Sequence, residues 1–226
     1  MNIYLVRHGQ SEQNANKNYF CSNDEIIPLT EKGIEQAKEA GIFLSKLPLG
    51  KTLIISSPYV RAKQTASEIA KLTNLKTIKY DNKLQEFKRG IFGNYTFEEC
   101  SKIFPEEFSE FKRQLKSKDK FYARPPEGES AYDLCLKLAP YKSILDKLKN
   151  ANYDSIIIVS HSGAIRSMLC SLMEYDKEWY YNEPNMQNCS IRHLKLEENF
   201  QDFGYIHKGY KIQRNNSSNN ENSLTM

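Results

Sequence analysis

The chain has 226 residues, a length that fits one α/β domain better than two. Its 32 lysines and arginines and 28 aspartates and glutamates give a net charge of +4, spread along the chain, which argues against nucleic acid as the partner. The five cysteines show no metal-ligand spacing, so we expect reduced thiols and no zinc site. With no leader-like segment and no apolar stretch of transmembrane length, we expect a cytoplasmic protein with no membrane partner.

The first predicted strand is the apolar run of residues 3–6, which ends abruptly in Arg7, His8 and Gly9. In open α/β sheets, ligands bind beyond the carboxyl ends of the strands. The glycine lets the backbone approach a ligand closely, the arginine offers a fork of donors for an oxyanion, and the histidine offers a nucleophilic nitrogen. This stretch indicates chemistry on a phosphate.

The next elements repeat the pattern of a buried strand that ends in polar groups. Thr30 is the expected N-cap of a helix over residues 31–47, and residues 52–56 read as a second buried strand. The helix after Pro58 carries Arg61, which is thus presented just past the end of that strand. Residues 76–80 form a short strand candidate, and the loop that follows contains Glu86.

The second half of the chain predicts a helical insertion and the rest of the sheet. Residues 96–121 are rich in charge and phenylalanine, which predicts helices that form an insertion or lid over about residues 96–125. Ser130 is the expected N-cap of one helix through Leu148. The strand over residues 155–159 is followed by His161 and Ser162, and a helix is expected from near Ala164.

Residues 189–196 alternate like a last, half-exposed strand, and the Asn- and Ser-rich residues 213–226 predict a disordered tail. Strand–helix alternation of this kind predicts an α/β fold with a mostly parallel central sheet and helices on both faces. We expect this domain to span residues 1–212.

Several segments, in a fixed order, match a known family. They are residues 7–11 with Asn14, 28–33 with Gln36 and Ala37, 56–66, 84–86 with Gly90, 125–130, and 159–163 with Arg166. This set resembles the histidine phosphatase superfamily, whose members include phosphoglycerate mutase-like enzymes, and within it a phosphatase-type branch. The resemblance implies the phosphoglycerate mutase-like fold, with the helical insertion over the active site.

The resemblance also implies a role for each matching residue. His8 would attack phosphorus and become a phosphohistidine, and Glu86 would protonate the departing alkoxide and then take a proton from the attacking water. The phosphoryl oxygens would be bound by the side chains of Arg7, Arg61, His161 and Asn14 and by the backbone N–H of Ser162. Because His8 must be unprotonated to attack, we expect the two neighbouring guanidiniums to keep its imidazole neutral near pH 7.

The leading hypothesis is a metal-independent phosphoric monoester hydrolase of the histidine acid phosphatase type, which needs no cofactor and acts on a small phosphorylated metabolite. A phosphoglycerate-type mutase primed by a bisphosphate and a non-catalytic phospholigand-binding protein are the alternatives. Two features depart from the family pattern. Ser162 stands where many relatives have glycine, and the loop over residues 15–24 lacks the glycine-containing pattern of sugar-phosphate mutases.

The phenylalanines of the insertion supply a hypothesis about specificity. We expect Phe104, Phe108 and Phe111 to belong to a lid that lines the substrate pocket and sets the substrate ranking. The phosphate pocket reads only the phosphoryl group, so the sequence leaves the substrate open, and it leaves the oligomeric state open as well.

Overall fold

The computed structural model describes residues 1–15 and 24–209. Within these residues the strands form one six-stranded sheet in the order β3-β2-β4-β1-β5-β6. The strands are β1 (Asn2–Arg7), β2 (Thr52–Ser56), β3 (Ile78–Tyr80), β4 (Ser155–Ser160), β5 (Ile191–Leu196) and β6 (Phe200–His207). The first four strands pair in parallel, β1 with β4, β4 with β2 and β2 with β3. In contrast, β5 is antiparallel to β1, and β6 is antiparallel to β5. The predicted mostly parallel α/β sheet is confirmed.

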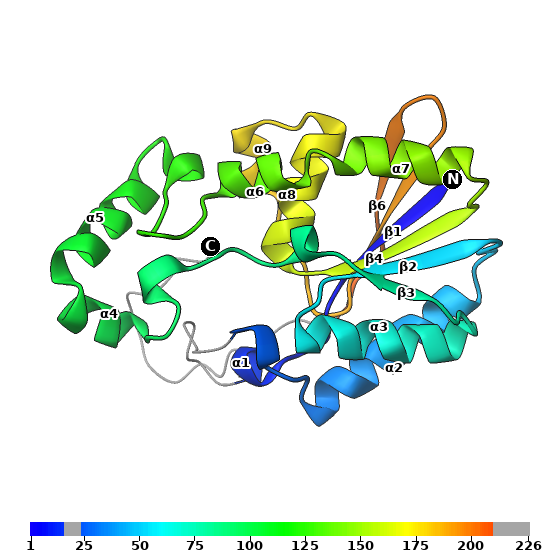
Figure 1. Cartoon of the computed structure of the whole chain (residues 1–226), viewed down its shortest axis with the longest axis horizontal. Coiled ribbons are helices and arrows are strands. Elements are labelled where there is room, and N and C mark those ends of the chain that lie inside the picture. The colour runs from blue at the N-terminus through cyan, green and yellow to red at the C-terminus, as the bar shows by residue number, and fades with distance from the viewer. Residues whose placement is uncertain (16–23, 210–226) are drawn as a thin grey trace.

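Helices cover both faces of this sheet, with α2 and α3 below it and α6, α7 and α8 above it in Figure 1. The helices are α1 (Glu12–Ala15), α2 (Glu31–Ser45), α3 (Val60–Thr73), α4 (Phe97–Ile103), α5 (Pro105–Lys116), α6 (Ala131–Leu138), α7 (Tyr141–Asn150), α8 (Ser162–Met173) and α9 (Lys177–Asn182). Short 3₁₀ turns occur at Asp24–Ile26, Asn82–Leu84, Gly90–Phe92 and Lys120–Tyr122. As predicted, the Thr30 side chain caps α2 by accepting from the backbone N–H of Gly33 at 3.0 Å.

The alternation of side chains along the central strands divides the core into two layers. Ile3 and Leu5 of β1 face the cluster that includes α6, α7 and α8, whereas Tyr4 and Val6 face the cluster that includes α2 and α3. β4 is buried along its whole length. A strand covered on both faces reads as a continuous apolar run, which is why the central strands were visible in the sequence.

The register of the central strands brings their carboxyl ends together. Arg7 of β1 pairs with Ser160 of β4, and Ser56 of β2 pairs with Val159. The backbone N–H of His8 donates to the carbonyl oxygen of Ser160 at 2.9 Å, so the polar residues that follow β1 and β4 lie side by side.

The helices α4 and α5 project from one end of the molecule, away from the sheet (Figure 1). Phe108 and Phe111 are buried there against Phe92 and Cys100, with Phe104 packed on the same cluster. The expectation that these phenylalanines line a substrate pocket is therefore wrong for the two buried ones, because their rings form the internal core of the α4–α5 unit.

The structure corrects the sequence interpretation at four places. The helix expected from Ser130 to Leu148 is two helices, because Pro140 has no N–H to donate and stands between α6 and α7. Helix α8 begins at Ser162 rather than near Ala164. β5 is not the last strand, since the half-exposed edge strand β6 follows it, and α9 was not predicted.

The remaining predictions concern the polar loop, the tail, the cysteines and the length of the helices. Most of the polar loop after Ala15 and the predicted tail over residues 213–226 lie outside the described residues. Cys100, Cys135, Cys170 and Cys189 are free thiols. Over residues 1–15 and 24–209, every helix is too short or too polar to cross a bilayer.

Candidate active site

His8 follows β1 and is held by both of its ring nitrogens. Its Nδ1 lies 2.7 Å from the carbonyl oxygen of Gly9, which can only accept, so Nδ1 carries the proton. Its Nε2 is therefore the nitrogen with the free electron pair, and it accepts a hydrogen bond of 3.2 Å from Nε of Arg61. The side chain is thus fixed in the tautomer that presents Nε2 as a nucleophile.

The surroundings of His8 disfavour its charged form. Burial lowers the pKa of His8 well below its usual value of 6.5, and the charges of Arg61 and Arg7 lower it further. The expectation that the two guanidiniums keep this imidazole neutral is confirmed in direction. A neutral imidazole with an available electron pair is the form that can attack phosphorus.

The turn after His8 is held against α2 and α3 by small residues. The backbone N–H of Gly9 donates to Oγ1 of Thr65 at 3.1 Å, and that hydroxyl donates to the carbonyl oxygen of Arg61 at 2.8 Å. A Cβ atom at Gly9 would lie 2.4 Å from the carbonyl oxygen of Gly33, so the turn can approach α2 only without a side chain there. These contacts set the position of His8 relative to Arg61.

Arg7 and Asn14 are both oriented by the segment before β5. Nη1 of Arg7 donates to the carbonyl oxygen of Met186, whereas its buried Nε has no hydrogen-bond partner among the described residues. Burial lowers the pKa of Arg7 to about 10, against the opposing attraction of Glu86. Nδ2 of Asn188 donates at 3.1 Å both to the carbonyl oxygen of His8 and to Oδ1 of Asn14. With that oxygen occupied, the amide nitrogen of Asn14 is its group that can donate to a ligand.

His161, the N-cap residue of α8, lies against His8 with a ring-centroid separation of 5.1 Å. Its Nε2 shares a hydrogen bond of 2.8 Å with Oγ of Ser57, and its buried Nδ1 has no partner among the described residues. Burial is the main reason that the pKa of His161 also lies well below 6.5. The side-chain oxygen of Ser162 is likewise buried without a hydrogen-bond partner in the described part of the chain.

Glu86 reaches the amino end of α8 from the loop after β3. Its Oε2 accepts from the backbone N–H of Gly163 at 3.0 Å, and its Oε1 accepts from the N–H of Phe87 at 3.2 Å. The carboxylate therefore lies at the same helix end as His161, and its charge acts on Arg7. A carboxyl group in this place can exchange a proton with a leaving group or a water molecule.

The loop that carries Glu86 is fastened at both ends. Oγ of Ser160 donates to the carbonyl oxygen of Leu84 at 2.7 Å. On the other side, Oε2 of Glu129 accepts from the N–H of Lys88 at 2.9 Å, and the N–H of Glu129 donates to the carbonyl oxygen of Lys88 at 2.8 Å. The matched segment over residues 125–130 thus positions the loop that carries Glu86.

All the side chains predicted for the site come together at the carboxyl ends of β1, β2 and β4. They are His8, Glu86, His161, Arg7 and Arg61, with Asn14 joined to the backbone of His8 through Asn188, and Ser162, predicted for its backbone N–H, directly after His161. The sequence interpretation missed the hydrogen-bonding roles of Asn188, Ser57 and Glu129. Glu129 stood in a matched segment, and Ser57 follows a strand end, but Asn188 had no signal beyond a polar stretch before β5.

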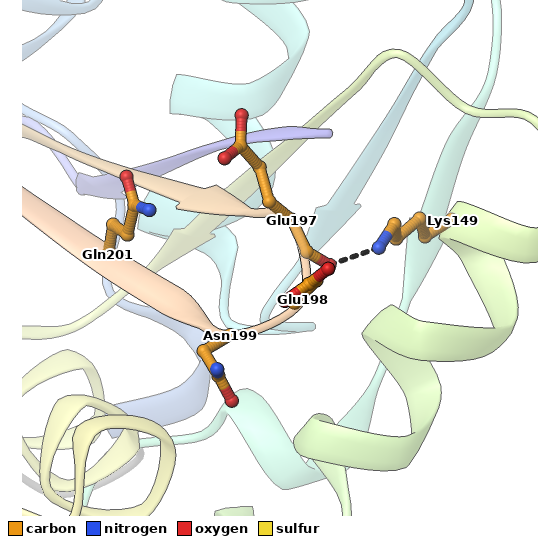
Figure 2. Close-up of a pocket in the computed structure, with 5 residues that line it drawn as sticks. All are labelled: Lys149, Glu197, Glu198, Asn199 and Gln201. Carbon is orange, nitrogen blue, oxygen red and sulfur yellow. Dashed lines mark hydrogen bonds between the residues drawn. The ribbon is translucent and has the colours of Figure 1, made fainter.

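A separate hollow, shown in Figure 2, lies where β5 ends and β1 begins, at the end of the sheet opposite the candidate active site. It is lined by Lys149, Glu197, Glu198, Asn199 and Gln201. Lys149 belongs to the end of α7, Glu197 follows β5, and the last residue of β5 bonds to the carbonyl oxygen of Met1. None of the predicted site residues lines this hollow.

Among the described residues, no group of three or more His, Cys, Asp or Glu side chains is arranged to hold a metal ion.

Gly163 supplies a test of the placement of Glu86. A Cβ atom there would lie 2.5 Å from Oε1 of Glu86 and 2.1 Å from the ring of Phe87, so Gly163→Ala must push the loop away from α8. We expect kcat for a phosphomonoester to fall by about 100-fold, because displacement of a catalytic group by about 1 Å has an effect of that size. Steady-state kinetics at fixed pH would measure the loss.

The matched control is Gly93→Ala, where the nearest atom to a new Cβ is 3.2 Å away and the backbone is helical. This variant is expected to keep kcat within about threefold of the wild type, because it leaves the placement of the acid group unchanged. Equal kcat values for the two variants would contradict the positioning role of Gly163.

Comparison with known proteins agrees with this geometry. The model of the histidine phosphatase superfamily (branch 1) matches residues 3–206. Phosphoserine phosphatase 1 of Hydrogenobacter thermophilus is 30% identical over 200 residues, which cover 87% of this chain and 88% of that protein. The probable phosphoglycerate mutase GpmB of Salmonella arizonae is 29% identical over 198 residues, covering 88% of this chain and 86% of that protein.

Solved structures show the same fold. The α-ribazole phosphatase of Shigella flexneri superimposes with a TM-score of 0.78 at 18% identity, covering 95% of this chain and all of that one (100%). The family match spans the ends of β1, β2 and β4, where the site residues gather, as well as the loop of Glu86. The chain therefore belongs to the histidine phosphatase superfamily, branch 1.

Proposed function

We propose that this protein hydrolyses small phosphomonoesters through a phosphohistidine formed at Nε2 of His8, without a metal ion or other cofactor. The observation that carries the proposal is the protonation state of His8. Its Nε2 accepts a hydrogen bond from Arg61 and so carries an electron pair, and burial together with two guanidiniums lowers the pKa of the ring. The phosphatases and the mutase among the relatives support an enzyme of this class.

The proposed reaction has two displacements at phosphorus. In the first, Nε2 of His8 forms a bond to phosphorus, the bond from phosphorus to the ester oxygen breaks, and Glu86, which enters this step in its protonated form, gives its proton to that oxygen. In the second, a water molecule attacks phosphorus, Glu86 takes the water proton, and the N–P bond breaks. The products are the free alcohol and inorganic phosphate, and His8 and Glu86 return to their starting states.

The remaining groups act on the charge of the transferring phosphoryl group. Its three outer oxygens carry negative charge throughout, so catalysis depends on donors placed before the reaction begins. Arg61 and the unpartnered Nε of Arg7 supply charged donors, and Asn14 supplies a neutral one. The buried Nδ1 of His161 is a further polar atom available to the phosphoryl group.

The test is phosphate release from p-nitrophenyl phosphate and a panel of natural phosphomonoesters in the presence of EDTA. We expect the folded wild-type protein to turn over these esters at the same rate with and without the chelator. Turnover that stops with EDTA and returns with a divalent cation would contradict the metal-independent proposal.

A primed mutase is the second candidate because several relatives carry the name of a probable phosphoglycerate mutase. A mutase must be primed by a bisphosphate, so adding 2,3-bisphosphoglycerate would stimulate conversion of 3-phosphoglycerate to 2-phosphoglycerate. In our proposal the bisphosphate produces no such conversion, and phosphate release proceeds without it.

A further inference from the structure

Ser57, the residue that follows β2, is a buried serine whose hydroxyl lies against His161. Its backbone N–H donates to the carbonyl oxygen of Val159 at 2.9 Å, which holds it beside β4. Its Oγ lies 2.8 Å from Nε2 of His161 and accepts from the backbone N–H of Tyr59 at 3.4 Å. Ser57 and His161 are both 0% exposed, so these bonds are made out of contact with bulk solvent.

The contacts of the Ser57 hydroxyl determine which group donates to which. The N–H of Tyr59 occupies an electron pair on Oγ and leaves the hydroxyl proton to be donated elsewhere. A buried hydroxyl that donates to nothing is unfavourable, and Nε2 of His161 is the acceptor that it meets among the described residues. The hydroxyl therefore donates to Nε2, which must carry an electron pair rather than a proton.

The ring of His161 then carries its proton on the other nitrogen. Burial is the main cause that holds the pKa of His161 well below 6.5, so the ring is neutral near pH 7. A neutral imidazole donates at one nitrogen and accepts at the other. Because Nε2 accepts, the donor is Nδ1, the atom that is buried without a hydrogen-bond partner in the described part of the chain.

The same ring is packed beside the nucleophile and has little freedom to turn. It meets the ring of His8 edge-on at a centroid separation of 5.1 Å, and it meets the ring of Tyr59 edge-on at the same separation. In this tautomer Nδ1 offers an N–H to a phosphoryl oxygen near His8. In the opposite tautomer Nδ1 would present an electron pair to an oxygen that is itself negatively charged, which is repulsive.

We propose that Ser57 is a positioning residue that keeps the proton of His161 on Nδ1, so that this N–H donates to an oxygen of the transferring phosphoryl group. The inference rests on the proposed phosphoryl transfer at His8, which it deepens by assigning the residue that prepares one of the donors. Ser57 acts through His161 and does not itself contact the phosphoryl group. A donor that is set before the reaction needs no reorganisation as charge develops in the transition state.

The first test measures the tautomer directly, by heteronuclear NMR of isotope-labelled histidine rings at neutral pH. The chain has four histidines, so the spectrum of His161→Asn identifies the signals of His161. We expect a protonated Nδ1 and an unprotonated Nε2. His193 is an internal reference with the opposite tautomer, because its Nε2 lies 3.0 Å from Oδ1 of Asn2, which can only accept. A proton on Nε2 of His161 in the wild type would overturn the proposal.

The second test is Ser57→Ala, which removes the donor to Nε2 and lets the ring exchange between its two tautomers. We expect kcat for p-nitrophenyl phosphate to fall by about 10- to 100-fold with KM nearly unchanged. The loss is smaller than that from removing a donor outright, because the ring still takes the productive tautomer part of the time. Ser57→Thr retains the hydroxyl and is expected to keep kcat within about threefold of the wild type.

Ser155→Ala is the control for loss of a buried hydroxyl. Ser155 is also 0% exposed, but it lies at the amino end of β4, away from the candidate active site. This variant should leave both kcat and the tautomer of His161 as in the wild type. An unchanged kcat in folded Ser57→Ala, or an equal loss in Ser57→Ala and Ser57→Thr, would refute the role of the Ser57 hydroxyl.

Failure of the proposed hydrolysis has a different signature. If the folded wild type released no phosphate from any ester, the proposed function would fall, and inorganic phosphate would serve as the probe for Ser57. We expect phosphate to shift the Nδ1–H signal of His161 in the wild type, and its Kd to be about tenfold higher in Ser57→Ala. Equal Kd values for the two proteins would remove the assignment of Ser57 independently of turnover.

Discussion

Replacing His8 with alanine is expected to lower kcat/KM for p-nitrophenyl phosphate by about 10⁴-fold or more, because loss of a covalent nucleophile has effects of that order. The variant removes the ring nitrogen that accepts a hydrogen bond from Nε of Arg61. Phosphate release measured with EDTA present would quantify the loss, and circular dichroism would show that the variant is folded.

The matched control is His193→Gln, since His193 lies on β5, stacks on the ring of Tyr4 and contacts Asn2 rather than the site. It is expected to keep near wild-type turnover. Rapid quenching of the wild type with labelled substrate should trap an acid-labile phosphoryl group that His8→Ala lacks. Undiminished turnover in folded His8→Ala would remove the proposed mechanism altogether.

Replacing Arg61 with glutamine should have two separable consequences. Loss of its guanidinium should lower kcat/KM by about 10²- to 10³-fold, the usual effect of removing one donor to a charged transition state. Because the charge of Arg61 lowers the pKa of His8, its removal should raise that pKa toward 6.5. His8 is active when neutral, so the acid limb of the pH profile of kcat/KM should move to higher pH.

The conservative variant Arg61→Lys separates charge from geometry. It retains a positive charge near His8 but loses the fork of donors and the Nε–H that bonds to Nε2. We expect kcat/KM to fall while the acid limb stays near its wild-type position. Using one substrate for all three proteins cancels the ionisation of the substrate itself. An acid limb that does not differ between Arg61→Gln and the wild type would contradict the electrostatic role assigned to Arg61.

The low pKa of His8 also predicts how the wild type responds to acid. Its imidazole stays neutral below pH 6.5, so its contribution to the acid limb should lie well below that value. The unfolded chain, in contrast, binds protons on His8 and His161 as the pH falls through 6.5. The free energy of unfolding should therefore decrease below pH 6.5, which urea titrations between pH 7.5 and 5 would measure.

Local patterns in the sequence were sufficient for the central sheet and for most of the candidate site. The apolar runs that form β1, β2 and β4 are recognisable because both faces of each strand are covered. His8, Arg61 and His161 could be selected because each follows such a run, and parallel strands deliver their carboxyl ends to one edge. Edge strand β6 was harder to predict because it is half-exposed. The break at Pro140 was harder to predict because it interrupts a continuous apolar pattern.

Long-range contacts decided the rest. Asn188 bonds to the backbone of His8 across 180 positions of sequence, and no spacing rule connects the two. The tautomer of His8 likewise depends on which segments pack together. The sequence by itself determined the strand ends, because these follow from local periodicity, and its resemblance to the histidine phosphatase superfamily implied which residues near them perform phosphoryl transfer. Only the tertiary structure decided their protonation, orientation and partners, because burial and charge at the site come from segments far apart in the chain.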